Sequence, residues 1–308
     1  MSRLPRYSLI GLALIVISEI AMFLQIDPFW TWHTPIAWTG YILLVDGLVW
    51  SRRGSSWLTD APTEFAFLTL MSVPLWLIFE AYNLLIRNWQ YINLPPNLAV
   101  RYASYAWAFA TIWPAIFETA ELIATLRGCS GADAPAGGGR LQPALGPPHR
   151  LRQGYSGRPK LHAKAEGGHH TRWGTVSIIA GAAMLLWPIV QPSSYLAAPV
   201  WLGFIFLLDP IDAHLGAESL TRDFQRGSRD RLTNLALSGF VCGVLWEFWN
   251  YWARSKWVYT VPIMEHLKIF EMPLPGYFGF PAFALECFTM YVFVRRMFWR
   301  GPTRQIAV

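Results

Sequence analysis

Charged residues are scarce in this sequence, making up only 14% of 308 residues. A soluble globular domain carries roughly 25% charged residues, so much of this chain's surface is expected to avoid water. Hydrophobic residues account for 54%, and there are 17 tryptophans and 19 phenylalanines. Many apolar residues gather in runs close to the ~20 residues that a helix needs to cross a bilayer. The composition therefore predicts a multi-pass membrane protein.

Motifs for metals, nucleotides and disulfides are also missing. The cysteines Cys129, Cys242 and Cys287 are an odd number and form no Cys-x-x-Cys pair, so they predict no disulfide framework. No predicted span contains His-x-x-x-His or Glu-x-x-His, and neither Gly-x-x-x-x-Gly-Lys-Ser/Thr nor Gly-x-Ser-x-Gly occurs. We expect no cofactor. The net charge of +6 lies largely in loops between apolar runs, which predicts a lipid bilayer as partner and not nucleic acid.

The apolar runs predict an all-α protein with about eight transmembrane helices. Lysine and arginine concentrate in alternate loops, and the positive-inside rule then places both termini in the cytoplasm. We therefore expect a multi-pass protein of the inner (plasma) membrane. The predicted spans cover residues 8–26, 35–50, 64–87, 103–126, 174–193, 196–213, 232–254 and 277–294.

The middle of the chain differs in composition from both flanks. Residues 128–172 are basic, rich in glycine and proline, and poor in apolar residues. Such a segment cannot bury a core, which predicts a disordered cytoplasmic linker. The linker separates a first four-helix unit, residues 1–127, from a second, residues 173–308.

These two units resemble each other in three motifs that occur in the same order. Because each unit has an even number of predicted spans, both insert with the same orientation, and a pseudo-two-fold axis along the membrane normal should relate them. The matching motifs are Pro35-x-x-Trp38-x-Gly40 with Pro199-x-Trp201-x-Gly203, Glu80-x-x-Asn83-x-x-x-Arg87 with Glu247-x-x-Asn250-x-x-x-Arg254, and Pro114 to Glu118 with Pro281 to Glu286.

The second motif places a polar stripe on an apolar helix, since positions i, i+3 and i+7 share one face. Counting along the helices puts Glu80 roughly 10 Å from the outer interface, and Glu118 and Glu286 roughly 13 Å from the inner one. Ionisable groups at such depth are functional by default. The predicted catalytic residues are Glu80, Glu247, Glu118 and Glu286, and the predicted substrate-binding or supporting residues are Asn83, Asn250, Arg87, Arg254, Trp246 and Trp249.

A purely structural role is the alternative for these residues. The long side chains of Arg87 and Arg254 could pair with Glu80 and Glu247, and indole N–H groups could satisfy the same carboxylates. Asp46 and Asp209 lie near helix ends, where capping is the simpler interpretation.

Three functions are consistent with this pattern. The first is an enzyme that uses paired glutamates as general acid and base on an apolar, lipid or isoprenoid-like substrate. In general plan the chain resembles small helical lycopene cyclases, which have internally repeated spans bearing carboxylates. Their acidic pair after a proline is not matched, because Pro281 is followed by the single Glu286. The alternatives are a proton-coupled transporter or channel and a structural or assembly subunit.

Overall fold

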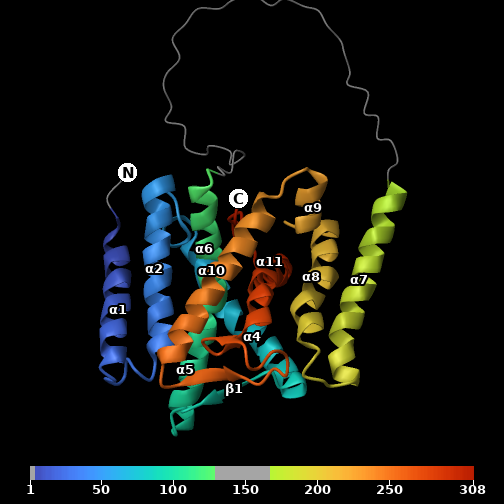
Figure 1. Ribbon diagram of the computed structural model, residues 1–308. Coiled ribbons are helices and arrows are strands. Elements are labelled where there is room, and N and C mark those ends of the chain that lie inside the picture. The colour runs from blue at the N-terminus through green and yellow to red at the C-terminus, as the bar shows by residue number, and fades with distance from the viewer. Residues whose placement is uncertain (1–3, 129–166) are drawn as a thin grey trace, which may run out of the picture.

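The computed structural model describes residues 4–128 and 167–308, and only the backbone of residues 167–171 (Figure 1). The predicted linker falls mostly on residues outside these ranges. The described elements are α1 (Arg6–Phe23), α2 (His33–Arg53), α3 (Trp57–Asp60), α4 (Pro62–Ile86), β1 (Trp89–Ile92), α5 (Leu98–Ala110), α6 (Ile112–Leu126), α7 (Gly167–Val190), α8 (Ala197–His214), α9 (Leu220–Gln225), α10 (Asp230–Trp252), β2 (Lys256–Tyr259), β3 (Lys268–Ile269), β4 (Met272–Pro273), the 3₁₀ helix η1 (Leu274–Phe278) and α11 (Gly279–Phe298).

The protein is mostly helical, and the predicted multi-pass helical membrane fold is confirmed at this level. In the described part of the chain, six helical segments are long and apolar enough to cross a bilayer. The helices α2 and α8 fall short of that measure, because Asp46, Asp209 and Asp212 lower their hydropathy. The six segments are Arg6–Phe23, Pro62–Ile86, Leu98–Leu126, Arg172–Val190, Asp230–Trp252 and Leu274–Phe298.

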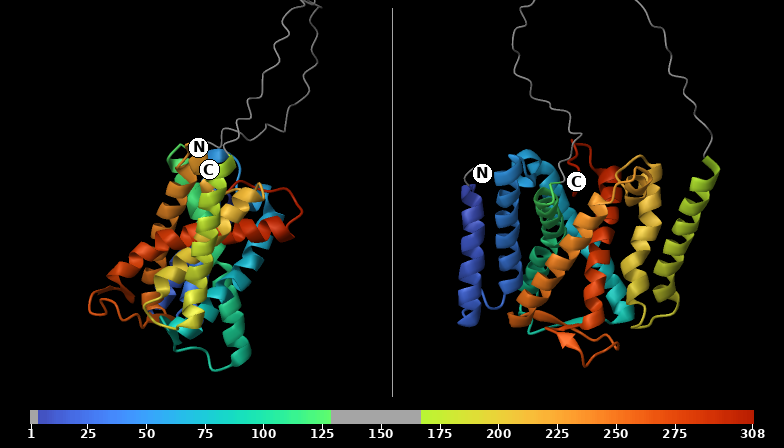
Figure 2. Two further views of the ribbon diagram at one scale, coloured as in Figure 1. Left: turned by 90° about the vertical axis from the view of Figure 1, so that its right-hand side faces the viewer. Right: turned by 45° about the horizontal axis from the view of Figure 1, so that its top comes forward.

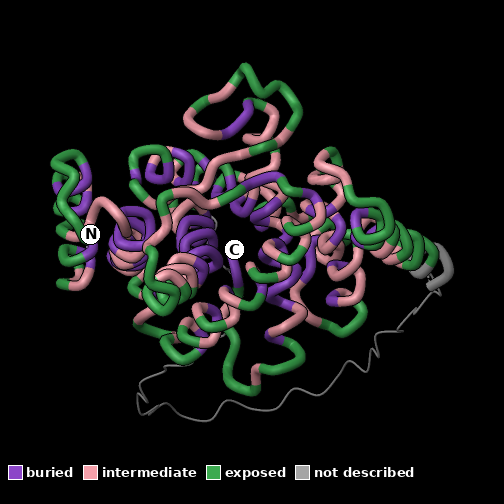
Figure 3. Tube along the Cα trace, turned by 90° about the horizontal axis from the view of Figure 1, so that it is seen from below, coloured by how far each residue is buried: buried purple, intermediate pink, exposed green. Residues whose placement is uncertain are grey.

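The outermost helices, α1 and α7, lie on opposite flanks of the bundle (Figure 1, Figure 3). Each exposes many large apolar side chains, and only 28% and 17% of their apolar windows are buried. Each packs closely on its neighbour through a glycine pair. A Cβ on Gly11 would lie 2.5 Å from the carbonyl oxygen of Gly40, and one on Gly181 would lie 2.7 Å from that of Gly203. Small residues at helix contacts with apolar faces outside are typical of membrane bundles.

Buried residues concentrate in α2, α6, α10 and α11. Trp113, Phe117 and Phe288 are fully buried there. The indole of Trp113 donates to the carbonyl oxygen of Cys287 at 2.9 Å, which joins α6 to α11.

Both termini lie at one end of the bundle, which we call the linker end (Figure 1). Asp46 and Asp209 act there as caps, as their positions indicated, and each caps the short helix that follows. Asp46 accepts from the Leu58 amide at 2.9 Å, and Asp209 accepts from the Leu220 amide at 2.6 Å. A carboxylate at a helix N-terminus satisfies free amides and favours the helix dipole.

Ion pairs also close the linker end. Arg295 pairs with Glu64 at 3.0 Å, and Arg304 pairs with Glu121 at 2.9 Å. Residues 299–308 fold back against this end, where Ile306 is fully buried. These contacts fasten α11 and the last residues to α4 and α6.

At the opposite end, which we call the ribbon end, β1 and β2 form an antiparallel two-stranded sheet (Figure 1, Figure 2). A second small sheet, β3–β4, lies in the segment between β2 and η1. The all-α prediction did not include these short strands.

Candidate functional site

Two asparagines fix the strands of the ribbon to the helices that precede them. Asn83 donates from Nδ2 to the carbonyl oxygen of Trp89 at 2.8 Å and accepts at Oδ1 from the Trp89 amide at 3.2 Å. Asn250 makes the same two bonds with Trp257, at 2.8 and 2.9 Å. Each asparagine side chain therefore makes the pair of backbone hydrogen bonds that a neighbouring strand would make. These bonds hold the residues after the helix in a turn back over the bundle.

The returning strand β1 covers Glu80 with hydrogen-bond donors. Glu80 Oε1 accepts from the Trp76 indole at 2.8 Å, from the Tyr91 hydroxyl at 2.5 Å and from the Trp89 indole at 3.3 Å. Trp76 comes from the same helix, one turn earlier. The carboxyl group therefore has three aromatic donors and, among the residues described by the structure, no cation partner.

The strand β2 covers Glu247 in a related way. Glu247 Oε1 accepts from the Tyr259 hydroxyl at 2.8 Å, and the Trp257 indole donates to the Tyr259 oxygen at 3.0 Å. Glu247 is fully buried, and its second oxygen, Oε2, has no hydrogen-bond partner in the described part of the chain. The Met272 amide and the Trp257 indole lie close to this carboxyl group, but neither completes a hydrogen bond to Oε2.

The ribbon brings these two carboxyl–phenol pairs together. Its register joins Trp89 to Tyr259 and Tyr91 to Trp257. Alternate residues of a strand share one face, so these four aromatic residues point to the same side of the ribbon. The other face carries Gln90 and Val258, which are also register partners.

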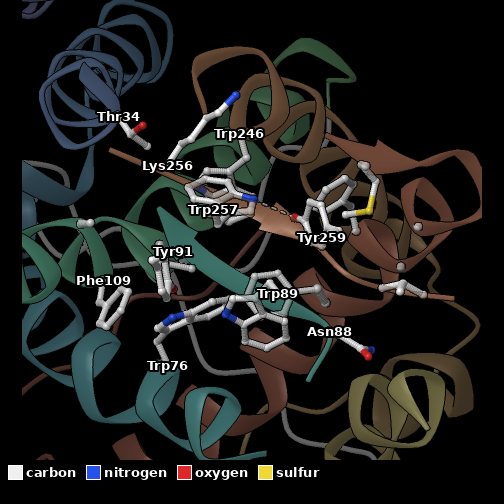
Figure 4. Close-up of a pocket in the computed structure, with 18 of the residues that line it drawn as sticks. Thr34, Trp76, Asn88, Trp89, Tyr91, Phe109, Trp246, Lys256, Trp257 and Tyr259 are labelled. Carbon is white, nitrogen blue, oxygen red and sulfur yellow. Dashed lines mark hydrogen bonds between the residues drawn. The ribbon is translucent and has the colours of Figure 1, made fainter. Parts of the chain in front are cut away.

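A cavity of about 530 Å³ lies on the aromatic side of the ribbon. This volume is in the range of small-molecule binding sites. Figure 4 shows Trp76, Trp89 and Tyr91 on one side and Trp246, Trp257 and Tyr259 on the other. Both units of the chain therefore contribute to its wall.

Phe283 occupies a central position in this wall. Its ring centroid lies 5.8 Å from Trp76, 5.1 Å from Trp201 and 5.9 Å from Trp246. Edge-to-face and tilted contacts of this kind are favourable for aromatic rings. The cavity therefore has a rigid aromatic interior that suits a flat, conjugated or otherwise apolar ligand.

The phenols at the ribbon lie outside the helical spans, and burial raises the pKa of both Tyr91 and Tyr259 well above the usual value. The neighbouring carboxyl groups of Glu80 and Glu247 raise these pKa values further. Both phenols therefore stay protonated at neutral pH. A phenol can accept a hydrogen bond while it donates one, so each can connect a carboxyl group to a ligand.

Glu118 and Glu286, the other two predicted catalytic residues, do not line this cavity. Glu118 is fully buried, and its carboxyl group lies beside that of Asp46 on α2. Glu286 is also fully buried and accepts from the Phe204 amide of α8 at 3.4 Å. Glu80 and Glu247 do not line the cavity either, but each accepts a hydrogen bond from a phenol that does, whereas Glu118 and Glu286 lie against other helices.

The arginines of the polar stripes do not pair with these glutamates. Arg254 forms an ion pair with Asp27 at 3.1 Å and lies over the Trp30 ring at 5.3 Å. Arg87 ends α4 in a left-handed conformation with φ 52°, and its carbonyl oxygen accepts from Thr260 at 2.7 Å. Among the described residues neither Glu80 nor Glu247 forms an ion pair. The alternative in which Arg87 and Arg254 pair with these glutamates is therefore not observed.

The two predicted tryptophans have different surroundings. Trp246 lines the cavity, whereas the Trp249 indole donates to Glu19 of α1 at 2.8 Å. Glu19 also lies 3.8 Å from the buried His33. No group of three or more histidine, cysteine, aspartate or glutamate residues in the described ranges is arranged to hold a metal.

Tyr91 and Tyr259 were not predicted as site residues, although each follows one of the polar stripes and lies two residues after a tryptophan. Tyr91 and Tyr259 are nevertheless the groups that connect the carboxylates to the cavity. Trp38 and Trp201, which were used only to align the repeats, also line it. The recurrence of these aromatic residues at matching positions was the available signal.

Comparison with known proteins gives no family for this chain. It matches no family model, no curated protein and no solved structure. The function is therefore argued from the cavity and its chemistry.

Proposed function

We propose that the protein is a membrane enzyme that performs acid–base chemistry on an apolar lipid or isoprenoid-like substrate. The observation that carries this proposal is an aromatic cavity whose wall contains two phenols, each hydrogen-bonded to a carboxyl group on a helix that is long and apolar enough to cross a membrane. Ionisable groups at this depth are costly and are usually retained for function.

In this proposal the Glu80–Tyr91 and Glu247–Tyr259 pairs transfer protons to and from the substrate. A protonated carboxyl group can pass its proton through the phenol to a substrate carbon or oxygen, and the ionised pair can take one back by the reverse route. The tryptophan rings of the wall bind the apolar body and stabilise positive charge that develops on it. Glu118 and Glu286 stay predictions without a contact to this cavity.

The same proposal includes a tandem repeat of two four-helix units with eight spans. The ribbon supports it, because the register places each Trp-x-Tyr tryptophan opposite the tyrosine of the other unit, as a two-fold axis between the strands requires. The matched glycine contacts of α1 with α2 and of α7 with α8 support it as well. Both termini would then lie in the cytoplasm, with the ribbon on the outer side of the inner membrane.

A proton-coupled transporter is the second candidate. It is favoured by one observation, the ion pairs that close the linker end while the cavity lies near the other end. Alternating access between two related halves would need such a closed end. The enzyme is favoured because Trp113, Phe117 and Phe288 are fully buried in the helix bundle, where bulky aromatic side chains fill space that a passing solute would need.

Lipid extracts of cells that produce the protein test the enzyme proposal. Mass spectrometry should detect a lipid species that appears with the unchanged protein and disappears with Glu247→Gln or Tyr259→Phe. Gln90→Ala, on the other face of the ribbon, is the matched control and should leave the species unchanged. Identical extracts from all four strains, with equal amounts of folded protein, would contradict the proposal.

A further inference from the structure

The cations of the cavity wall differ in whether they are already neutralised. Arg101 and Lys256 line the cavity, and no described aspartate or glutamate does. Lys256 forms an ion pair with Glu271 at 2.6 Å and lies over the Tyr251 ring at 4.9 Å. Arg101 donates from Nε to the carbonyl oxygen of Pro95 at 2.9 Å. Its two terminal nitrogens make no hydrogen bond or ion pair with the described residues, so they can bind a ligand.

Three further polar atoms of the wall are buried and unpartnered. In the described part of the chain, Trp32 Nε1, Thr34 Oγ1 and Trp38 Nε1 have no hydrogen-bond partner, although all three residues line the cavity. The Trp38 side chain is only 1% exposed and Thr34 only 8%. An indole nitrogen can donate but not accept, and a buried donor without a partner is costly. No residue that the structure describes provides an acceptor for these groups.

The wall changes from charged to apolar along α5. Arg101, Tyr105 and Phe109 lie one helical turn apart from each other on one face, and all three line the cavity. From Arg101 to Phe109 the helix advances about 12 Å toward the bundle centre. The Trp107 indole donates to Thr39 at 3.0 Å, which places this helix beside α2, the helix that carries Thr34 and Trp38.

We propose that the natural ligand is an anionic amphiphile, with a carboxylate or phosphate head at Arg101 and an apolar chain among the aromatic residues. The proposal rests on the proposed function and adds the chemical class of the substrate head. An acidic oxygen accepts from a guanidinium and from the free indole and hydroxyl groups, whereas a neutral hydrocarbon leaves all of them unsatisfied.

A pair of fluorescent probes tests this directly. Cis-parinaric acid and its methyl ester share one conjugated chain and differ only in the charge of the head. With full-length protein in the non-ionic detergent dodecyl maltoside, tryptophan-to-probe energy transfer should show that the acid binds at least about ten-fold tighter than the ester. Arg101→Gln should abolish that preference. Arg296→Gln, at an exposed arginine outside the cavity, is the matched control and should keep it.

Competition separates the two head chemistries. Displacement of the acid by dodecyl phosphate at similar concentration would show that a lipid phosphate also fits, whereas displacement by inorganic phosphate alone would show that the chain is not needed and would overturn the amphiphile proposal. If Arg101→Gln does not fold, the Trp32→Phe, Trp38→Phe double variant replaces it and should weaken acid binding about ten-fold relative to the ester.

The outcomes also separate this inference from the proposed function. Equal binding of acid and ester by the unchanged protein, blocked for both by Ala108→Trp in the cavity wall, would overturn the anionic head and leave the cavity as an apolar substrate site. If the protein binds neither probe, the amphiphile proposal is overturned but the proposed function is not, because enzymatic proton transfer is measured independently of these probes.

Discussion

The two carboxyl–phenol pairs of the cavity differ in how many donors each carboxylate receives. Glu80 accepts three hydrogen bonds, from Trp76, Trp89 and Tyr91. Glu247 accepts one, from Tyr259, and its Oε2 is buried without a partner in the described residues. Glu80 therefore receives three donors at one oxygen, Oε1, whereas Glu247 receives one donor and has a buried oxygen without a partner among the described residues.

This difference follows from the sequence one turn before each glutamate. Trp76 precedes Glu80 by four residues, and the matching position before Glu247 is Gly243. A side chain there would collide with the ring of Phe280, which packs directly on this glycine. The second unit therefore cannot provide the same indole donor. We infer that Glu80 mainly stabilises the site and that Glu247–Tyr259 is the more reactive pair.

The largest expected effect is on stability. Glu80→Ala leaves three aromatic donors without their acceptor and should lower the free energy of unfolding by about 3–5 kcal/mol. Glu247→Ala removes one hydrogen bond and a buried carboxyl group, and should lower it by no more than about 1–2 kcal/mol. Thermal unfolding in detergent, followed by size-exclusion profiles, measures both. Equal losses would contradict the assigned division of roles.

The next effect is on catalysis. Tyr259→Phe removes the proton-transferring hydroxyl of the reactive pair and should slow product formation about 100-fold or more. Tyr91→Phe should slow it less than about ten-fold, since Glu80 keeps two indole donors and its pair is not the principal one. Rates with purified protein and lipid extract provide the measurement. A larger loss in Tyr91→Phe would reverse the assignment.

The strand anchors provide a smaller contrast. Asn83 makes three hydrogen bonds with the segment that follows its helix, including one from the Asn88 amide, whereas Asn250 makes two. Asn83→Ala should therefore destabilise the protein by about 2–3 kcal/mol and Asn250→Ala by about 1–2 kcal/mol. Protease sensitivity of the ribbon end should rise in the same order, with Gln90→Ala as the unaffected control.

Alkaline pH should have the smallest effect. The raised pKa values of Tyr91 and Tyr259 mean that the folded protein holds these protons more tightly than the unfolded chain. Their contribution is complete below the unfolded value of about 10 and is lost as the pH rises through the higher folded values. Melting temperatures from about pH 8 to 11.5 should therefore fall more steeply above pH 10 in the unchanged protein than in the Tyr91→Phe, Tyr259→Phe variant. If melting temperature fell equally with pH in the two proteins, folding would not raise the pKa values of the two phenols.

The sequence was informative about helices and less informative about what they enclose. The stripe spacing correctly placed Glu80 with Asn83 and Glu247 with Asn250 on single helices, because helical periodicity is local. It did not predict the ribbon, since β1 and β2 are four residues each and pair across the two units. A strand this short has no strong local signal, and its stability comes from its partner and the asparagine anchors.

Depth along a helix was likewise not enough to define the site. Counting residues placed Glu118 and Glu286 near the height of the other glutamates, but it does not say which neighbour a side chain faces. Glu118 faces Asp46 on α2, and Glu286 faces Phe204 on α8. The direction of a side chain depends on how whole helices pack, which a single sequence does not specify.

Proton transfer from solvent is the most direct test of acid–base chemistry in this cavity. Purified protein and a lipid extract are incubated in D₂O, and mass spectrometry follows deuterium at carbon. We predict that one lipid or its product gains deuterium with the unchanged protein and with Gln90→Ala, and does so about 100-fold more slowly with Tyr259→Phe. No uptake at carbon in any lipid, or equal uptake with all three proteins, would contradict the proposed chemistry.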